Sequence, residues 1–217
     1  MAKLLVLGGS GFIGRHICQF AVARGHQVVS VTRSGAPERV GAWVKAVTWV
    51  AADIFEPDLW RTHLLGCEAV AHAVGLYKER PAQGLTFSRI LADSAIVAAD
   101  EAERASTSTF IFVSTKTTPP GADKRFIQEK RRAERDITAR ALRSVILRPS
   151  LVYGVQQPVA ALVGLGIEAA RLLPGVSVAP PMSVTTLAQA AVSAVESRGV
   201  SGVQRVHDIQ ALAALGS

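Results

Sequence analysis

The stretch LLVLGGSGFIGRHICQFAVARG, residues 4–25, places a glycine-rich turn between an apolar run and a helical pattern. Gly9, Gly11 and Gly14 form a G-x-G-x-x-G array, and Gly8 precedes it. Between a strand and a helix, this spacing gives a tight turn, close backbone approach for a pyrophosphate, and close packing of the helix on the strand. Free N–H groups at the helix start favour the phosphates. The predicted cofactor-binding turn comprises Gly8, Gly9, Ser10, Gly11, Phe12, Ile13 and Gly14.

Two other glycine motifs do not fit this stretch, because no Lys-Ser/Thr pair completes a P-loop and GGSGF lacks the spacing of a hydrolase nucleophile elbow. A glycine turn that binds no ligand remains the structural alternative.

Short runs rich in Val, Ile and Leu alternate with helical patterns along the first two thirds of the chain. The expected strands are KLLVLG, QVVSVT, AVTWV, EAVAHAV, TFIFVS and SVILRP, and the expected helices are 12–24, 85–104 and 123–140. Continuous apolar strands separated by helices predict a parallel sheet covered on both faces, which is a doubly wound α/β fold. We expect a dinucleotide-binding core over residues 1–154 and a small C-terminal lid or substrate region, residues 155–217, packed on the same domain. Helices are expected there near 159–173 and 184–197.

The end of the second strand decides the expected cofactor. NAD-selective sites carry an acidic residue at this point to hold the ribose 2′-OH. Here the chain has Thr32, Arg33 and Ser34. Because Arg33 could pair with a 2′-phosphate, the sequence favours NADP, with NAD as the alternative.

The 217 residues carry a net charge of +7, but the basic residues are dispersed and lack interleaved aromatic residues. We therefore expect no nucleic-acid partner. The two cysteines are expected to be reduced core residues, and the five scattered histidines predict no metal site.

The longest apolar stretch, near 158–176, is interrupted by Glu168 and Arg171, so we expect no membrane span. Peripheral contact with a membrane stays open, as does the choice between monomer and homodimer. No secretory leader precedes the first strand, which favours the cytoplasm. A mitochondrial location is the alternative if a targeting segment has been removed.

Several motifs together resemble the atypical, extended-like short-chain dehydrogenases/reductases, a family with an NAD(P)-binding Rossmann fold. They are GGSGFIGRHI, ADI at 52–54, AHAVG at 71–75, FVST at 112–115, Lys130, and LRPSLVYG at 147–154. The segments QVVSVTRSG and SVILRPSLVYG are similar in sequence to one subgroup of this family in particular. It contains the fungal accessory protein of coenzyme Q biosynthesis and the nucleotide-binding accessory subunit of respiratory complex I.

The resemblance implies positions around the cofactor. Asp53 and Ile54 would border the adenine, and Ala73, Val74 and Gly75 would line the ribose. Ser114 and Thr115 would face the nicotinamide as candidate catalytic residues. Pro149, Ser150, Leu151 and Val152 would pass along its far side.

The helix 123–140 raises a question about chemistry. At helical spacing, Phe126, Lys130, Ala133 and Ile137 share one side, and Lys130 is the only charge among them. In active members of the family, a tyrosine four residues before this lysine donates a proton, and the lysine holds the nicotinamide ribose. Phe126 occupies the tyrosine position. The resemblance thus implies that Lys130 binds the cofactor, while the alternative is a lysine extending to solvent at the helix rim.

Three functions remain open from the sequence. The first is an NAD(P)(H)-binding protein linked to quinone or ubiquinone metabolism, with weak or no conventional reductase activity. The second is an active NADPH-dependent reductase of a small apolar carbonyl or quinone, in which Tyr77, Tyr153, Lys116 or water held by Ser114 would replace the missing tyrosine. The third is a non-catalytic interaction subunit with a vestigial cofactor site.

Overall fold

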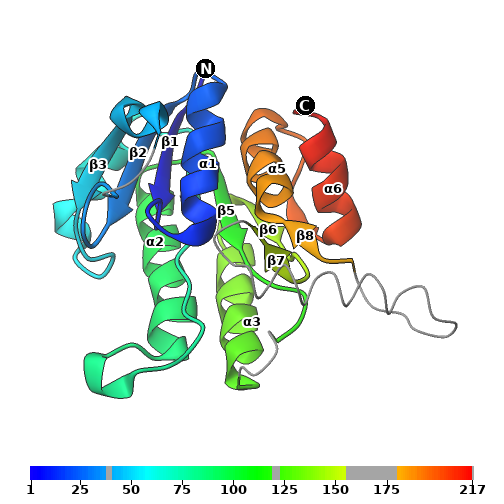
Figure 1. The fold of residues 1–217 in the computed structure, drawn as a ribbon. Coiled ribbons are helices and arrows are strands. Elements are labelled where there is room, and N and C mark those ends of the chain that lie inside the picture. The colour runs from blue at the N-terminus through cyan, green and yellow to red at the C-terminus, as the bar shows by residue number, and fades with distance from the viewer. Residues whose placement is uncertain (38–40, 119–122, 155–179, 217) are drawn as a thin grey trace, which may run out of the picture.

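Seven parallel strands form one sheet in the computed structural model, which describes residues 1–37, 41–118, 123–154 and 180–216 (Figure 1). Their order is β3-β2-β1-β4-β5-β6-β9, and every neighbouring pair is parallel. The strands are β1 Lys3–Leu7, β2 Gln27–Thr32, β3 Val47–Ala51, β4 Ala69–His72, β5 Thr109–Val113, β6 Arg143–Leu147 and β9 Gly202–Gln204. The strand order reverses between β1 and β4, where ligands of doubly wound sheets bind. The predicted doubly wound α/β fold is confirmed.

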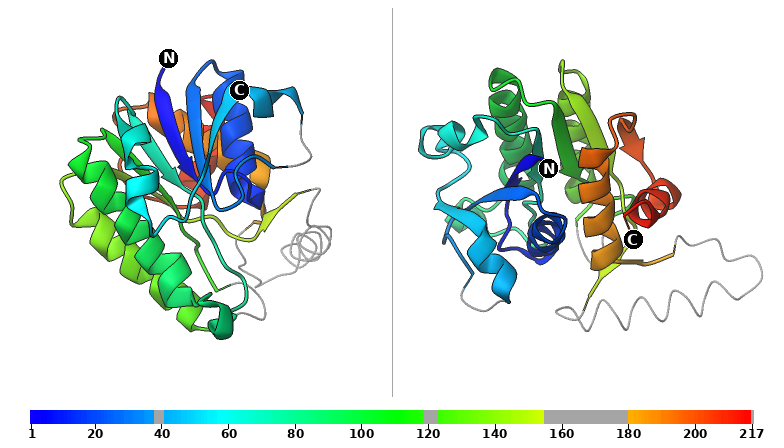
Figure 2. Two further views of the ribbon diagram at one scale, coloured as in Figure 1. Left: turned by 90° about the vertical axis from the view of Figure 1, so that its left-hand side faces the viewer. Right: turned by 90° about the horizontal axis from the view of Figure 1, so that it is seen from above.

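Helices cover both faces of the sheet (Figure 2). One layer holds α1 Phe12–Ala23, α5 Val184–Glu196 and α6 Val206–Ala214, and the other holds α2 Ser94–Arg104 and α3 Arg125–Thr138. Successive strand residues serve the two layers in turn, as Leu4 in β1 packs into the first core and Leu5 into the second. This double burial explains why the strands are continuous apolar runs.

Short elements connect the main ones. They are the 3-10 turns η1 Ala42–Ala46, η2 Pro57–Leu59, η3 Arg61–Leu64 and η4 Pro81–Gln83, the π-helical turn η5 Ser88–Asp93, and a two-stranded parallel ladder of β7 Val152–Tyr153 and β8 Met182–Ser183. The helix expected over 85–104 was placed too early, because Leu85 pairs with Arg80 in an antiparallel bridge. The helical segment starts only after it, with a π-helical turn before α2.

The C-terminal part of the described chain belongs to the main sheet. β9 pairs with β6, α5 packs against α1, and α6 packs against α5. Residues 182–214 therefore extend the same domain. The helix expected near 159–173 lies outside the described residues.

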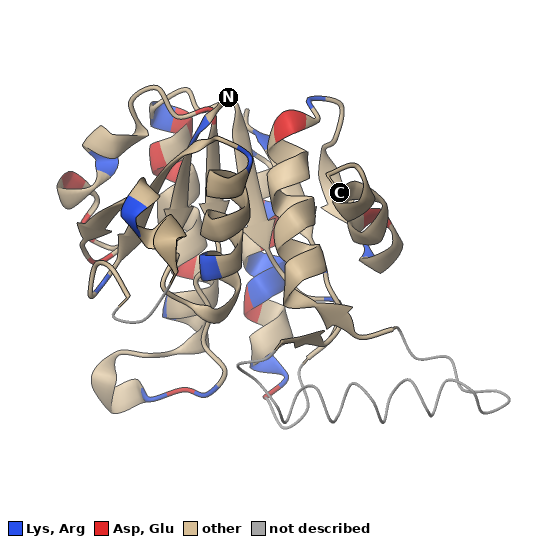
Figure 3. Ribbon diagram, turned by 45° about the horizontal axis from the view of Figure 1, so that its top comes forward, with Lys and Arg blue, Asp and Glu red and all other residues tan. Residues whose placement is uncertain are grey.

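The helix α3 carries both basic and acidic residues (Figure 3), and several of them form ion pairs with other parts of the chain. Arg132 contacts Asp93 and Glu129. Asp136 contacts Arg140, which follows the helix and also contacts Asp100 at 2.5 Å. These pairs join α3 to η5 and α2. Cys18 and Cys67 are free and buried, as predicted.

Candidate cofactor-binding site

The glycine turn joins β1 to α1 at the carboxyl edge of the sheet. Gly8 has φ +87°, a backbone conformation that favours glycine. A Cβ at Gly14 would lie 2.2 Å from the carbonyl oxygen of Gly8, so only glycine lets α1 approach the turn this closely. The turn therefore has the shape that a dinucleotide pyrophosphate requires.

The start of α1 leaves backbone donors available. Gly11 is the N-cap and contributes no side-chain hydrogen bond, and the Arg15 amide donates to the Gly11 carbonyl at 3.1 Å. The amides of residues 12–14 thus precede the first helical hydrogen bond. Their N–H groups and the helix dipole make this end suited to phosphate.

The residues expected at the adenosine end lie at the neighbouring strand ends. Thr32 is buried, and its hydroxyl donates to the Gly35 carbonyl at 2.6 Å. Arg33 and Ser34 follow it and are exposed. Beyond β3, Asp53 accepts a 3.0 Å hydrogen bond from the Phe55 amide. The next residue, Ile54, is buried in the core beneath this edge.

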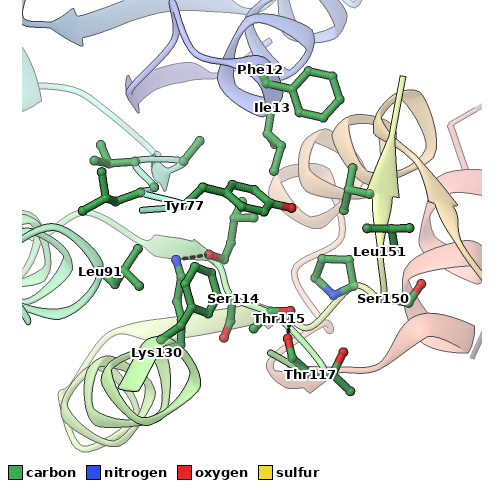
Figure 4. A pocket seen from close by; sticks show the side chains of 18 residues that line it. Phe12, Ile13, Tyr77, Leu91, Ser114, Thr115, Thr117, Lys130, Ser150 and Leu151 are labelled. Carbon is green, nitrogen blue, oxygen red and sulfur yellow. Dashed lines mark hydrogen bonds between the residues drawn. The ribbon is translucent and has the colours of Figure 1, made fainter. Parts of the chain in front are cut away.

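A cavity of about 160 Å3 opens beside the turn, at the carboxyl ends of β4, β5 and β6 (Figure 4). Residues 12–13, 73–77, 113–115 and 149–152 line it, together with Leu91, Thr117, Phe126 and Lys130. It brings together the predicted residues Phe12, Ile13, Ala73, Val74, Gly75, Ser114, Thr115, Lys130, Pro149, Ser150, Leu151 and Val152. Gly8 to Gly11, Gly14, Thr32, Arg33, Ser34, Asp53 and Ile54 are not part of its wall.

Lys130 is only 4% exposed, so it does not extend to solvent. Its Nζ donates a 2.8 Å hydrogen bond to the Val113 carbonyl and lies 4.5 Å from the centre of the Phe112 ring. Burial lowers the pKa of Lys130 to about 7, against the opposing charge of Glu134. Glu134 is also buried on this side of α3, so the stripe carries two charged residues where the sequence suggested one.

The two hydroxyls expected to face the nicotinamide are engaged by the protein. Ser114 Oγ donates to Glu134 Oε1 at 2.5 Å, and Thr115 Oγ1 donates to the Thr117 carbonyl at 2.8 Å. Glu134 was missed from the sequence. Its position one helical turn after Lys130 is the signal that could have revealed it.

Phe126 packs in an aromatic and aliphatic cluster. It is 7% exposed, its ring lies 5.5 Å from that of Phe87 in a T-shaped contact, and Leu91 completes the cluster. The Tyr77 ring lies 6.4 Å from Phe126, and its hydroxyl extends across the cavity toward Leu151 (Figure 4). Tyr77 is 58% exposed, and the partial burial of its ring raises its pKa. Among the described residues that line the cavity, Tyr77 is the one tyrosine. Its hydroxyl is therefore the candidate to replace the one that Phe126 lacks.

The loop that carries Tyr77 is attached to α3. Glu79 accepts hydrogen bonds from the Phe87 amide at 2.7 Å and from Arg125 at 2.6 Å. No sequence pattern indicates this attachment, since the three residues are not neighbours along the chain.

Comparisons with known proteins show the family of this chain. The NAD(P)H-binding family model matches residues 8–170. An uncharacterized chloroplastic protein of Arabidopsis thaliana is 30% identical over 234 residues, covering 98% of this chain and 77% of the plant protein. MIOREX complex component 2 of Saccharomyces cerevisiae is 31% identical over 201 residues, covering 70% of this chain and 73% of the yeast protein.

Solved structures share the fold. A putative NAD-dependent epimerase/dehydratase from Bacillus halodurans superposes with a TM-score of 0.69 at 19% identity, covering 94% of this chain and 92% of that one. UDP-glucuronic acid 4-epimerase from Bacillus cereus, solved in complex with NAD, gives a TM-score of 0.69 at 18% identity, covering 94% and 76%. The chain belongs to the NAD(P)H-binding family, and it shares the Rossmann fold of these epimerase/dehydratase structures.

Proposed function

We propose that this protein binds NADPH in preference to NADH and has weak or no conventional reductase activity. The observation that carries the proposal is the combination of an intact cofactor turn with Phe126 one helical turn before a buried, cavity-lining Lys130. The residues proposed to hold the cofactor are present, whereas Phe126 places a hydrocarbon ring where active members of the resembled family have the proton-donating tyrosine.

The preference for NADPH is supported by the end of β2. Arg33 is exposed there, and the described residues offer its side chain no hydrogen-bond or ion-pair partner. A guanidinium at this position can bind a 2′-phosphate in bidentate geometry. No carboxylate stands beside it on the strand to bind the ribose 2′-OH instead.

When bound, the cofactor supplies hydride at its nicotinamide end. The chain's own residues would hold that end between Lys130 and the 149–152 segment, with Lys130 donating to ribose hydroxyls. Proton delivery is the missing step. Phe126 carries no proton, and the Ser114 and Thr115 hydroxyls donate to partners within the protein. A substrate carbonyl in the cavity would thus receive no proton by the usual route.

A link to quinone or ubiquinone metabolism is part of the proposal. It is supported by the resemblance to the coenzyme Q accessory subgroup and by the apolar wall formed by Leu76, Leu91 and Leu151. Hydrophobic walls with few polar groups suit a quinone ring. We propose the cytoplasm as the compartment, with an organelle as the alternative that the chloroplastic plant relative supports. Within the described residues, no helix has the length and hydropathy needed to cross a membrane.

An active reductase is the second candidate, and the position of Tyr77 favours it. Its hydroxyl extends over the cavity (Figure 4) and could donate a proton to a substrate there, and its ring lies 6.4 Å from that of Phe126. Ceramide reductase of Caulobacter vibrioides is 29% identical over 149 residues, covering 69% of this chain and 46% of that enzyme. In this second candidate function, Tyr77 donates the proton in place of the tyrosine that is absent at position 126.

A turnover assay separates the two candidates. The protein would be loaded with NADPH and mixed with short-chain quinones, aldehydes and ketones, and nicotinamide oxidation would be followed by absorbance. We expect binding without turnover. Steady NADPH oxidation that is lost in Tyr77→Phe would contradict the first candidate and support the second.

A further inference from the structure

A second pocket, of about 380 Å3, lies next to the loop after β5, where Lys116 lines it. Basic side chains from four parts of the chain line it: Lys116 after β5, Arg131 on α3, Arg148 after β6, and Arg205 with His207 at the start of α6. Its other lining residues are Pro180, Val206 and Gln210, so among the described residues it has no acidic lining. Elements far apart in sequence thus place four positively charged side chains around one concavity.

Two of these arginines are fixed from behind by a buried carboxylate. Arg148 donates through Nε at 3.0 Å and Nη2 at 2.5 Å to the two oxygens of Glu134. Arg131 Nη1 donates to Glu134 Oε1 at 2.5 Å, and its Nη2 donates to the Thr115 carbonyl at 2.8 Å. Glu134 is 3% exposed. The guanidinium groups are therefore held in place before any ligand arrives, which lowers the entropic cost of binding.

Charge is not balanced within this cluster. One Glu134 carboxylate faces two arginines, and burial together with the charge of Arg148 lowers the pKa of Arg131. The exposed Lys116 and Arg205 add two further charges at the rim. Asp208 accepts a hydrogen bond from the Arg205 amide at 2.8 Å and is not a lining residue. A net positive pocket of this kind attracts an anion.

The first turn of α6 faces the same pocket through Val206 and His207. This helix has nine residues, and its amino end carries the positive end of the helix dipole. Arginine forks, a lysine and a helix start are the groups that bind phosphate oxygens in proteins. A phosphate group presents more acceptor oxygens than a carboxylate, so this number of cationic groups favours a phosphate as the ligand.

The pocket is separate from the cofactor cavity but shares a wall with it. Thr115 and Thr117 line the cavity while Lys116 lines the pocket, and the Lys116 amide donates to the Pro149 carbonyl at 2.7 Å. Similarly, Ser150 lines the cavity and donates to the carbonyl of Pro180, a residue of the pocket. A ligand in the pocket would sit next to the nicotinamide end without occupying the cofactor turn.

We propose that this basic pocket, lined by Lys116, Arg131, Arg148, Arg205 and His207, binds the phosphate group of a small molecule other than the nicotinamide cofactor.

The test is a calorimetric titration with inorganic pyrophosphate in the presence of saturating NADPH, which occupies the glycine turn. We expect binding with one site per chain. The double variant Lys116→Ala/Arg205→Ala, which leaves Glu134 and its two arginines in place, should weaken that binding by about tenfold or more, because two charge-assisted contacts are lost. The matched control Lys45→Ala removes an exposed charge beside β3 and should leave the affinity unchanged.

Four results would overturn the proposal. Two concern the cofactor: pyrophosphate does not bind in the presence of NADPH, or NADPH displaces it in one-to-one competition. The other two are that Lys45→Ala weakens pyrophosphate binding as much as the double variant does, and that citrate binds as tightly as pyrophosphate. If NADPH itself fails to bind, the titration is run without it. Loss of pyrophosphate binding in the double variant then still supports this pocket, while the proposed function fails separately.

Discussion

Lys130 Nζ donates a 2.8 Å hydrogen bond to the backbone carbonyl of Val113, the last residue of β5. The contact holds a buried amino group at the cavity wall, beside the strand end where Ser114 begins the loop. Its position and lowered pKa have consequences for stability, binding and chemistry that experiments can separate.

The stability of the protein should depend on pH through Lys130. Its pKa is about 7 in the folded protein and 10.5 for a lysine side chain exposed to water, so between these values the unfolded chain binds more protons. The cost of burying Lys130 is therefore full below about pH 7 and decreases as the pH rises toward 10.5. Lys130→Met should be more stable than the wild type at pH 7 by on the order of a few kcal/mol. The difference, measured by urea unfolding, should shrink by pH 10, and a difference independent of pH would contradict this account.

Phe126→Tyr should create or raise reductase activity. The new hydroxyl would stand one helical turn from Lys130, where proton transfer contributes roughly 10²-fold or more to the rate. NADPH oxidation with quinones and carbonyls measures the gain, and Phe126→Leu, which adds no hydroxyl, is the matched control. No gain despite unchanged NADPH binding would count against the role assigned to position 126.

Gly14→Ala should disrupt the turn. The added methyl would meet the Gly8 carbonyl at 2.2 Å, so α1 must move away from β1. We expect a loss of about 2 kcal/mol or more of stability and a loss of NADPH binding. Gly199→Ala is the control, since nothing lies within 4 Å of its added Cβ. Thermal unfolding and cofactor titration of both variants test this. Equal stability and equal NADPH affinity in the two variants would contradict the close approach of Gly14 to the Gly8 carbonyl.

Glu134→Gln should destabilise the protein by about 3–5 kcal/mol, because it removes the buried charge that holds two arginines. Glutamine keeps one acceptor oxygen for the Ser114 hydroxyl, so this variant tests the charge of Glu134. Glu129→Gln, on the outer side of the same helix, breaks an ion pair with Arg132 and should cost less than about 1 kcal/mol. Urea unfolding measures both losses of stability. Similar losses would show that the Glu134 cluster, which is Glu134 with Ser114, Arg131 and Arg148, stabilises the protein no more than a surface ion pair does.

Local patterns predicted much of the fold and many of the residues that line the cavity. The roles of Gly8 to Gly14 depend on backbone conformation within one turn, and the strands had to be apolar on both faces, so both were visible in the sequence. Lys130 was visible because its charge interrupts an apolar helix stripe. These features need only a few neighbouring residues.

Features that depend on register between distant elements were not predictable. The Glu134 cluster joins α3, the end of β6 and the loop after β5, and no single segment contains its pattern. The attachment of the Tyr77 loop through Glu79 to Arg125 is of the same kind. The start of the helix near residue 85 was placed wrongly because the bridge between Arg80 and Leu85 competes with helix formation.

The most direct test of the central claim is a calorimetric titration of the wild type, Lys130→Ala and Arg33→Asp with NADPH and NADH. The account predicts that the wild type binds NADPH more tightly than NADH. Binding should weaken about tenfold or more in Lys130→Ala, and preference should move toward NADH in Arg33→Asp. Absence of binding to either dinucleotide, or NADPH affinity unchanged in both variants, would contradict the assignment of this cavity and turn as a cofactor site.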